Sequence, residues 1–231
     1  SKLVSLFKNT NEFIIQENIS SGGKGTFILN KHNEAFIQSQ LNNSLYLVSP
    51  RIKNSYPVNI HISISKKEII IFPPSLQIIQ EKGNKRLYVG ADFVQAKSIP
   101  LEIVESIKKI ANKIGKQIQS IGYRGFLGID FIVDNKSKIL FVEVNPRFQG
   151  SSILLNRACI NNNLKSIYEL NKIMFNDSIK KIDKDKYEKL NVNESLMLYK
   201  KAENNNNYNY LYSRFLNSYQ YEVLSDGYKH N

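Results

Sequence analysis

The sequence predicts a mixed α/β (α+β) fold in which helices flank an antiparallel sheet. Residues 58–64 alternate apolar and polar side chains with period two, which is typical of an antiparallel strand with one solvated face. Residues 101–121 repeat apolar side chains at helical spacing. Residues 125–133 and 138–144 are apolar runs joined by Asp-Asn-Lys-Ser, whose residues all favour turns, so they predict a hairpin.

The first third of the chain is predicted to be rich in strands. Residues 1–7 have the spacing of a short amphipathic helix. A glycine cluster, Gly22, Gly23 and Gly25, then separates two short apolar runs. Strands are expected at 13–16, 26–30, 44–50, 57–65 and 68–74.

Two helices are predicted in the remainder. The helix over 101–121 follows Pro100, which suits a first-turn position, and precedes Gly122, which suits the residue just past a helix end. A second helix is expected over 164–175. From residue 176 onward the chain is polar and includes an asparagine run at 204–207.

Composition excludes several classes of protein. At 231 residues with 42% hydrophobic content the chain can bury a substantial core. No apolar run approaches the roughly 20 residues of a membrane span, and no signal peptide is evident, so a cytoplasmic location is expected. The single cysteine, Cys159, is expected to be a small buried apolar residue. His32, His61 and His230 are scattered and suggest no zinc site.

The predicted hairpin carries the chemistry. On its second strand Glu143 and Asn145 share a face, and pairing Asp134 with Ser137 across the turn would place Asp130 opposite Phe141 on that same face. Two carboxylates and an amide oxygen suit a hard cation, Mg²⁺ or Mn²⁺, and not zinc. Arg147 follows, with a fork geometry suited to phosphate or carboxylate. The alternative is an edge strand on which Glu143 simply pairs with Arg147.

A second candidate element is the segment 20–27, Ser-Ser-Gly-Gly-Lys-Gly-Thr-Phe. Its glycines allow backbone N–H groups to approach an anion, and Lys24 adds positive charge. The spacing is neither that of a P-loop nor that of a dinucleotide fingerprint. An ordinary hairpin turn is the alternative.

Together these two elements resemble the ATP-grasp ligases, from about Phe13 to Ser152. The resemblance implies a small lobe whose glycine-rich hairpin covers a larger antiparallel sheet flanked by helices. It also implies ATP and Mg²⁺ (or Mn²⁺) as cofactors, and Arg147 as the catalytic residue that neutralises the transferred phosphate. The metal ligands would be Asp130, Glu143 and Asn145, and the nucleotide would contact Gln16, Ser21, Gly22, Gly23, Lys24 and Gly25.

Three features depart from the family pattern. Gln16 stands where members commonly have a phosphate-binding lysine. The usual N-terminal substrate domain is missing, so the chain is expected to be part of a longer protein with that domain as a partner. Ser151 and Ser152 stand where biotin carboxylases have an acidic base, which weakens a bicarbonate-dependent function. The expected organisation is a partial small lobe over 1–48, a large lobe with the metal-binding hairpin over 49–175, and a polar extension over 176–231.

The function favoured on these grounds is ATP-dependent joining of a small-molecule carboxylate to an amine through an acyl phosphate. The alternative is an ATP-binding module without ligase activity, because of Gln16 and the missing domain. The net charge of +12 and the tyrosines at 208, 210 and 212 admit a single-stranded nucleic-acid binder as a third possibility. Those tyrosines lie where the chain has almost no net charge, which counts against it.

Overall fold

The computed structural model describes residues 11–19, 25–41, 45–83, 85–176, 182–201, 209–217 and 220–224. Ser21, Gly22, Gly23, Lys24, Tyr208 and the predicted helix over 1–7 lie outside these ranges. The chain divides into two compact units, residues 1–54 with 79–89, and residues 55–78 with 90–231.

The described residues of the first unit form a small antiparallel sheet and helix α2 (Glu34–Gln40). Strand β1 (Glu12–Glu17) pairs with both β2 (Thr26–Asn30) and β3 (Tyr46–Pro50), and helix α2 follows β2. Phe13, Ile15, Leu29 and Ile37 form its buried core. The unit also contains an ion-pair network, because Arg51 contacts Glu12 at 2.9 Å and Glu81 at 3.0 Å.

The second unit is built around the long antiparallel pair β4 (Ser55–Ile64) and β8 (Gly125–Asp134), which are paired over ten residues. Strand β9 (Ile139–Asn145) lies on the outer side of β8, and β5 (Ile69–Ile71) pairs with the end of β4. Strands β6 (Ser75–Lys82) and β7 (Lys85–Asp92) each contribute to both units, because residues 79–89 belong to the first unit and their remaining residues to the second. The pairing order continues from β7 to β10 (Ser195–Lys201), β11 (Asn209–Asn217) and β12 (Gln220–Leu224).

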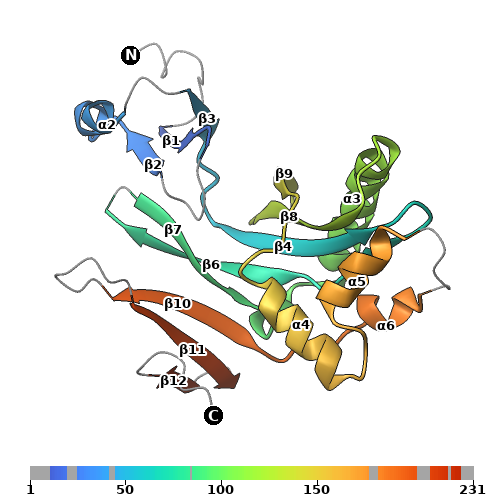
Figure 1. The fold of residues 1–231 in the computed structure, drawn as a ribbon. Helices are drawn as coiled ribbons and strands as arrows, with labels where there is room; N and C mark the ends of the chain where they lie inside the picture. Colours follow the sequence, from blue (N-terminus) through green and yellow to red (C-terminus); the bar gives the residue numbers. More distant parts are fainter. Residues whose placement is uncertain are drawn as a thin grey trace. The chain divides into compact units, whose positions relative to one another are not determined.

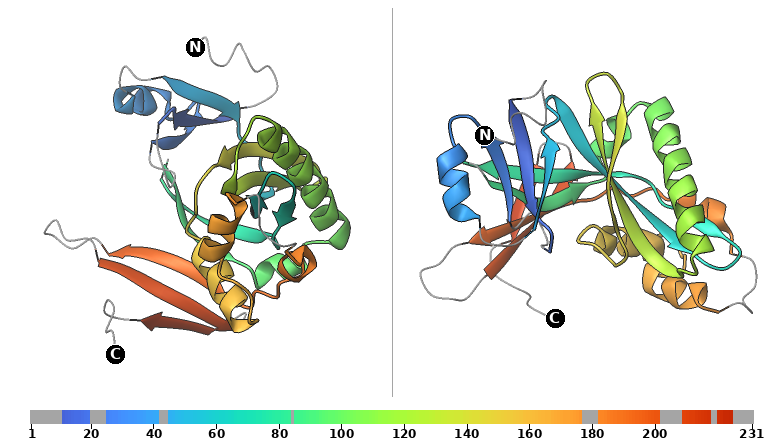
Figure 2. Two further views of the ribbon diagram at one scale, coloured as in Figure 1. Left: turned by 45° about the vertical axis from the view of Figure 1, so that its right-hand side comes forward. Right: turned by 90° about the horizontal axis from the view of Figure 1, so that it is seen from above.

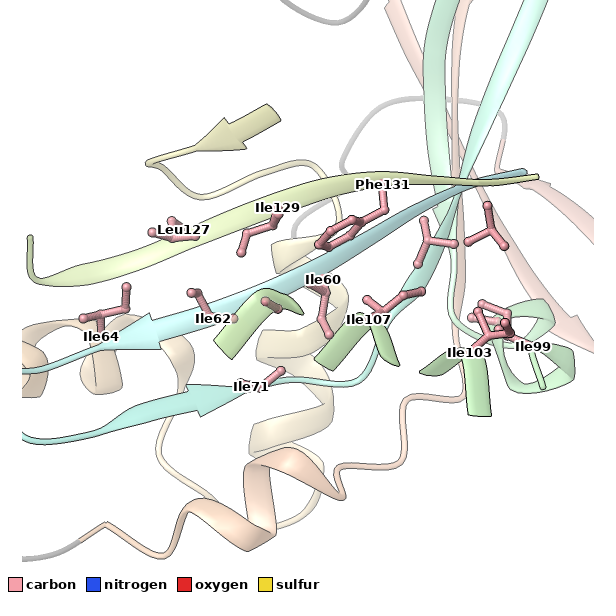
Figure 3. Packing of buried hydrophobic residues seen from close by; sticks show 14 residues of the cluster. Ile60, Ile62, Ile64, Ile71, Ile99, Ile103, Ile107, Leu127, Ile129 and Phe131 are labelled. Atoms are coloured by element: carbon pink, nitrogen blue, oxygen red, sulfur yellow. The ribbon is translucent and has the colours of Figure 1, made fainter. Parts of the chain in front are cut away.

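Helices cover both faces of the β4–β8 pair (Figures 1 and 2). On one face, α3 (Leu101–Ser120) packs against the even-numbered residues of β4, and Figure 3 shows Ile60, Ile62 and Ile107 in this cluster. The predicted helix over 101–121 is confirmed, with Gly122 at a φ of +95° just beyond its end. On the other face lie α4 (Ser152–Asn161), α5 (Ile167–Met174) and α6 (Lys184–Glu188). The short 3-10 helix η1 (Gln95–Ser98) precedes α3, and its Ala96 belongs to the core on the α3 side.

The second core explains why the expectation of a half-solvated β4 is wrong. Phe72, Phe126, Leu155 and Leu170 are buried between the sheet and helices α4 to α6. Three polar residues at odd-numbered positions of β4, Asn59, His61 and Ser63, lie on this face and are buried. Cys159 of α4 is buried here as expected, and burial raises the pKa of its thiol to about 12.

Candidate functional site

The β8–β9 hairpin brings the three predicted metal ligands together. Asp130 pairs directly with Glu143 across the ladder, and Asn145 pairs with Gly128, one position along the same face. Nδ2 of Asn145 donates to Oδ2 of Asp130 at 3.1 Å and to Oε1 of Glu143 at 3.0 Å. The two carboxylates therefore share the NH2 group of Asn145 as a donor and face a common point.

The expected register of this hairpin is wrong in one detail. Phe141 was expected opposite Asp130, but it pairs with Phe131, and Val142 is the extra residue of a β-bulge. The rings of Phe131 and Phe141 lie 6.4 Å apart, so Phe141 points to the α3 side of the sheet and not to the side of Glu143. The bulge thus places Glu143 directly opposite Asp130, closer than the diagonal position predicted.

The two carboxylates occupy different environments. Asp130 is 8% exposed, whereas Glu143 is exposed. Burial raises the pKa of Asp130 to about 6, and the negative charge of Glu143 increases this shift. Hydrogen bonds from the side chains of Asn59 and Gln77 oppose it. Without a cation, the folded protein therefore carries an unfavourable charge at Asp130.

Arg147 lies just beyond this pair. Its guanidinium donates to the carbonyl oxygen of Phe148 at 3.2 Å and to Oδ1 of Asn145 at 3.4 Å. It is exposed and forms no ion pair with any residue that the structure describes, Glu143 included. The alternative of a Glu143–Arg147 surface pair is therefore not what the structure shows, and the guanidinium remains available to an anion.

Two site residues, Asn59 and His61 of β4, were not identified from the sequence. Asn59 donates to Oδ1 of Asp130 at 2.5 Å and to Oε1 of Gln149 at 2.8 Å. His61, fully buried on the same strand, lies 3.3 Å from the hydroxyl of Ser151 and 3.1 Å from that of Ser152. The signal was present in the alternation of β4, but the polar positions were interpreted as solvated.

His61 acts here as a neutral, structural contact. Burial lowers the pKa of its imidazole to about 3, so the ring carries no charge at neutral pH. Its ring lies 5.2 Å from that of Phe126, and its Nε2 contacts the first residues of α4. Ser151 and Ser152 are thereby held against the sheet and buried.

Of the predicted nucleotide-binding residues, the structure describes Gln16 and Gly25. Gln16 lies on β1 between Thr26 of β2 and Leu47 of β3. Gly25 has a φ of +69°, and a Cβ there would lie 2.7 Å from Oε2 of Glu17, so the turn requires glycine.

The donor set fits a hard divalent cation. Among the described residues, no group of three or more His, Cys, Asp or Glu side chains could hold a metal. The set at the hairpin instead consists of two carboxylates and one amide, whose oxygens suit Mg²⁺ or Mn²⁺. In this structure the Nδ2 group of Asn145 lies where the two carboxylates favour positive charge, and its Oδ1 accepts from Arg147, so the amide would have to turn over to present its oxygen to a cation.

Comparison with known proteins gives the same assignment. A family model described as an ATP-grasp domain matches residues 3–151. A curated relative, the butirosin acyl-carrier protein–L-glutamate ligase of Niallia circulans, is 28% identical over 141 residues, which cover 58% of this chain and 32% of that protein. The chain thus spans about a third of the length of this relative.

Solved structures share the fold at low sequence identity. The ATP complex of carboxyaminoimidazole ribonucleotide synthase from Aspergillus clavatus has a TM-score of 0.65 and 12% identity, covering 86% of this chain and 48% of that one. The biotin carboxylase domain of Hydrogenobacter thermophilus 2-oxoglutarate carboxylase, with MgADP and bicarbonate, has a TM-score of 0.60 and 14% identity, covering 86% and 43%.

The match to the family model spans more than half of the chain and includes the hairpin that carries Asp130, Glu143 and Asn145. The chain therefore belongs to the ATP-grasp family, and the predicted fold is confirmed. No helix among the described residues is long and apolar enough to cross a membrane.

Proposed function

We propose that the protein is an ATP-dependent carboxylate–amine ligase that activates its carboxylate substrate as an acyl phosphate. The observation that carries this proposal is the pairing of Asp130 with Glu143 beside an arginine that has no acidic partner among the described residues. Cation ligands next to an available guanidinium are what phosphoryl transfer requires, since its catalysis depends on positioning and charge stabilisation.

Asp130, Glu143 and Asn145 would hold Mg²⁺, and the ion when bound neutralises phosphate charge. The guanidinium of Arg147 would bind the transferred phosphoryl group, with backbone N–H groups of the segment Ser20–Thr26 as further donors. The substrate carboxylate oxygen attacks the γ-phosphorus, the bond from phosphorus to the β–γ bridging oxygen breaks, and ADP leaves. The amine nitrogen then attacks the acyl carbon, inorganic phosphate leaves, and the amine loses a proton.

Ser151 and Ser152 support an organic carboxylate substrate over bicarbonate. Both hydroxyls are buried and contact His61, so this position supplies no carboxylate base. The relative in Niallia circulans is a ligase for L-glutamate and an acyl-carrier protein. L-Glutamate is therefore the first amino acid to test, both as the carboxylate and as the amine.

The test is ADP release by the protein with Mg²⁺–ATP and pools of carboxylic acids and amino acids, with product mass as the second readout. A carboxylate labelled with ¹⁸O should transfer one labelled oxygen to inorganic phosphate, because the acyl–oxygen bond breaks when the amine attacks. Label that stays entirely in the product would contradict an acyl phosphate.

The competing function is nucleotide binding without ligation, which Gln16 favours because a glutamine supplies no charge to the phosphates. It predicts ATP binding with no ADP release under any substrate combination. A Gln16→Lys variant distinguishes reduced affinity from lost function, since it should tighten ATP binding if position 16 contacts the phosphates.

A further inference from the structure

Asn59 occupies an unusual position for an uncharged polar side chain. It is 2% exposed in the middle of β4 and pairs with Asp130 across the β4–β8 ladder. Its Nδ2 group donates to Oδ1 of Asp130 at 2.5 Å and to Oε1 of Gln149 at 2.8 Å. One buried amide group therefore connects the proposed metal carboxylate to the turn that follows Arg147.

The chemistry of the partners fixes the orientation of this amide. The ionised carboxylate of Asp130 can only accept, so the side chain of Asn59 must present its NH2 group there, and the same group donates to Oε1 of Gln149. The cost is that Oδ1 of Asn59 is buried without a hydrogen-bond partner among the described residues. Buried polar groups are rarely left unpaired. The two hydrogen bonds that Nδ2 donates therefore outweigh the missing hydrogen bond to Oδ1.

The Gln149 end of this connection is also held firmly. The side chain of Gln149 lies against Gly128, where any Cβ would collide with its amide. The backbone N–H of Gln149 donates to the hydroxyl of Ser152 at 2.8 Å, and that hydroxyl contacts His61. Two residues of β4, Asn59 and His61, thus anchor the segment that begins at Arg147.

We propose that Asn59 is a positioning residue that orients Asp130 toward the cation and holds Gln149, and with it the Arg147 turn, in register with the metal site. This inference rests on the proposed function, because it requires a cation at Asp130. By engaging Oδ1 of Asp130, Asn59 leaves Oδ2 on the side of Asn145 and Glu143. Asp130 also accepts a hydrogen bond from the side chain of Gln77, so without Asn59 the carboxylate keeps that bond but loses the buried donor to Oδ1.

The test compares Asn59→Leu, which keeps the approximate shape and removes the donors, with Ser63→Ala as a matched control. Ser63 lies on the same strand and face, is equally buried, and its hydroxyl has no partner in the described part of the chain. The affinity for ADP is measured by calorimetry with and without Mn²⁺, and the readout is the factor by which Mn²⁺ tightens ADP binding.

We expect this factor to fall by roughly tenfold or more in Asn59→Leu, the usual effect of losing a hydrogen-bond partner of a metal ligand, and to stay unchanged in Ser63→Ala. A purely structural role would lower the melting temperature and leave the factor intact. If Asn59→Leu does not fold, Asn59→Ser serves, because its hydroxyl is too short to reach both partners.

Glu143→Gln separates this inference from the proposed function. If Glu143→Gln abolishes the Mn²⁺ effect and neither Asn59 variant changes it, Asn59 is not a positioning residue and the ligase proposal stands. If the parent protein shows no Mn²⁺ effect on ADP affinity, both proposals are overturned.

Discussion

Replacing Glu143 with glutamine removes one negative charge from the candidate metal site and changes little else. The side chain is exposed, it contacts the Nδ2 group of Asn145 and the carboxyl group of Asp130, and glutamine has nearly the same shape. Without a cation, the variant should be more stable than the parent, because two carboxylates no longer face each other. With Mg²⁺–ATP, it should gain less stability than the parent.

The magnitudes follow from the geometry. The oxygens of Asp130 and Glu143 that share the Asn145 donor lie at 3.1 and 3.0 Å from it, so they are separated by no more than about 6 Å. Repulsion at that distance is about 0.7 kcal/mol in water and about 3 kcal/mol at an effective dielectric constant of 20. Because Glu143 is exposed, we expect about 1 kcal/mol, which raises the melting temperature by about 2–4 °C in a protein of this size.

Ligand-induced stabilisation should change in the opposite direction. A ligand at one hundred times its Kd stabilises the parent by about 2.7 kcal/mol, and a variant with one-hundredfold weaker affinity gains only about 0.4 kcal/mol. The assay is thermal melting of both proteins, each with and without Mg²⁺–ATP. An equal ATP-induced shift in the two proteins would remove Glu143 from the metal site and refute the reasoning.

Three further predictions test other parts of the site. Gly128→Ala should displace the side chain of Gln149 and lower the unfolding free energy by about 1–3 kcal/mol. It should also weaken Mn²⁺-dependent ADP binding, and a normal Mn²⁺ effect would show that the contact between Gly128 and Gln149 is dispensable. Arg147→Ala should lower kcat by about 10²–10³ with an unchanged melting temperature, and an unchanged kcat would exclude Arg147 from the reaction. Finally, the pKa of Asp130 is raised from 3.8 to about 6 in the metal-free folded state, which therefore holds this proton more tightly than the unfolded state. The free energy of unfolding should decline as the pH rises from about 4 to 6. The variant Asp130→Asn should lose this dependence in pH-dependent denaturant unfolding.

Regular, local patterns were predictable from the sequence. The helix over 101–120 forms where its apolar spacing predicts it, because one face of a long helix must be buried. The hairpin forms because two apolar runs are joined by turn residues, and Asp130 and Glu143 share a face as predicted. These features depend on residues close in the chain, so a single sequence is enough to find them.

Features that depend on distant packing were not predictable. The alternation of β4 indicates two faces but does not say what covers the polar one, and helix α4, which covers it, was not predicted. The β-bulge at Val142 depends on the pairing of Phe141 with Phe131 and has no glycine or proline to mark it. Both errors concern tertiary contacts that override local periodicity.

The neutral amide of Asn59 also has an electrostatic consequence. Asp130 and Glu143 carry two negative charges and Arg147 carries one positive charge, so the site has a net charge of about −1 when both acids are ionised. A bound divalent cation would change this to about +1, which favours an anionic phosphate chain. A carboxylate in place of Asn59 would cancel that excess and bring a third negative charge against the buried Asp130. An uncharged donor at this position can therefore hold Asp130 in place and still leave the metal-loaded site attractive to ATP.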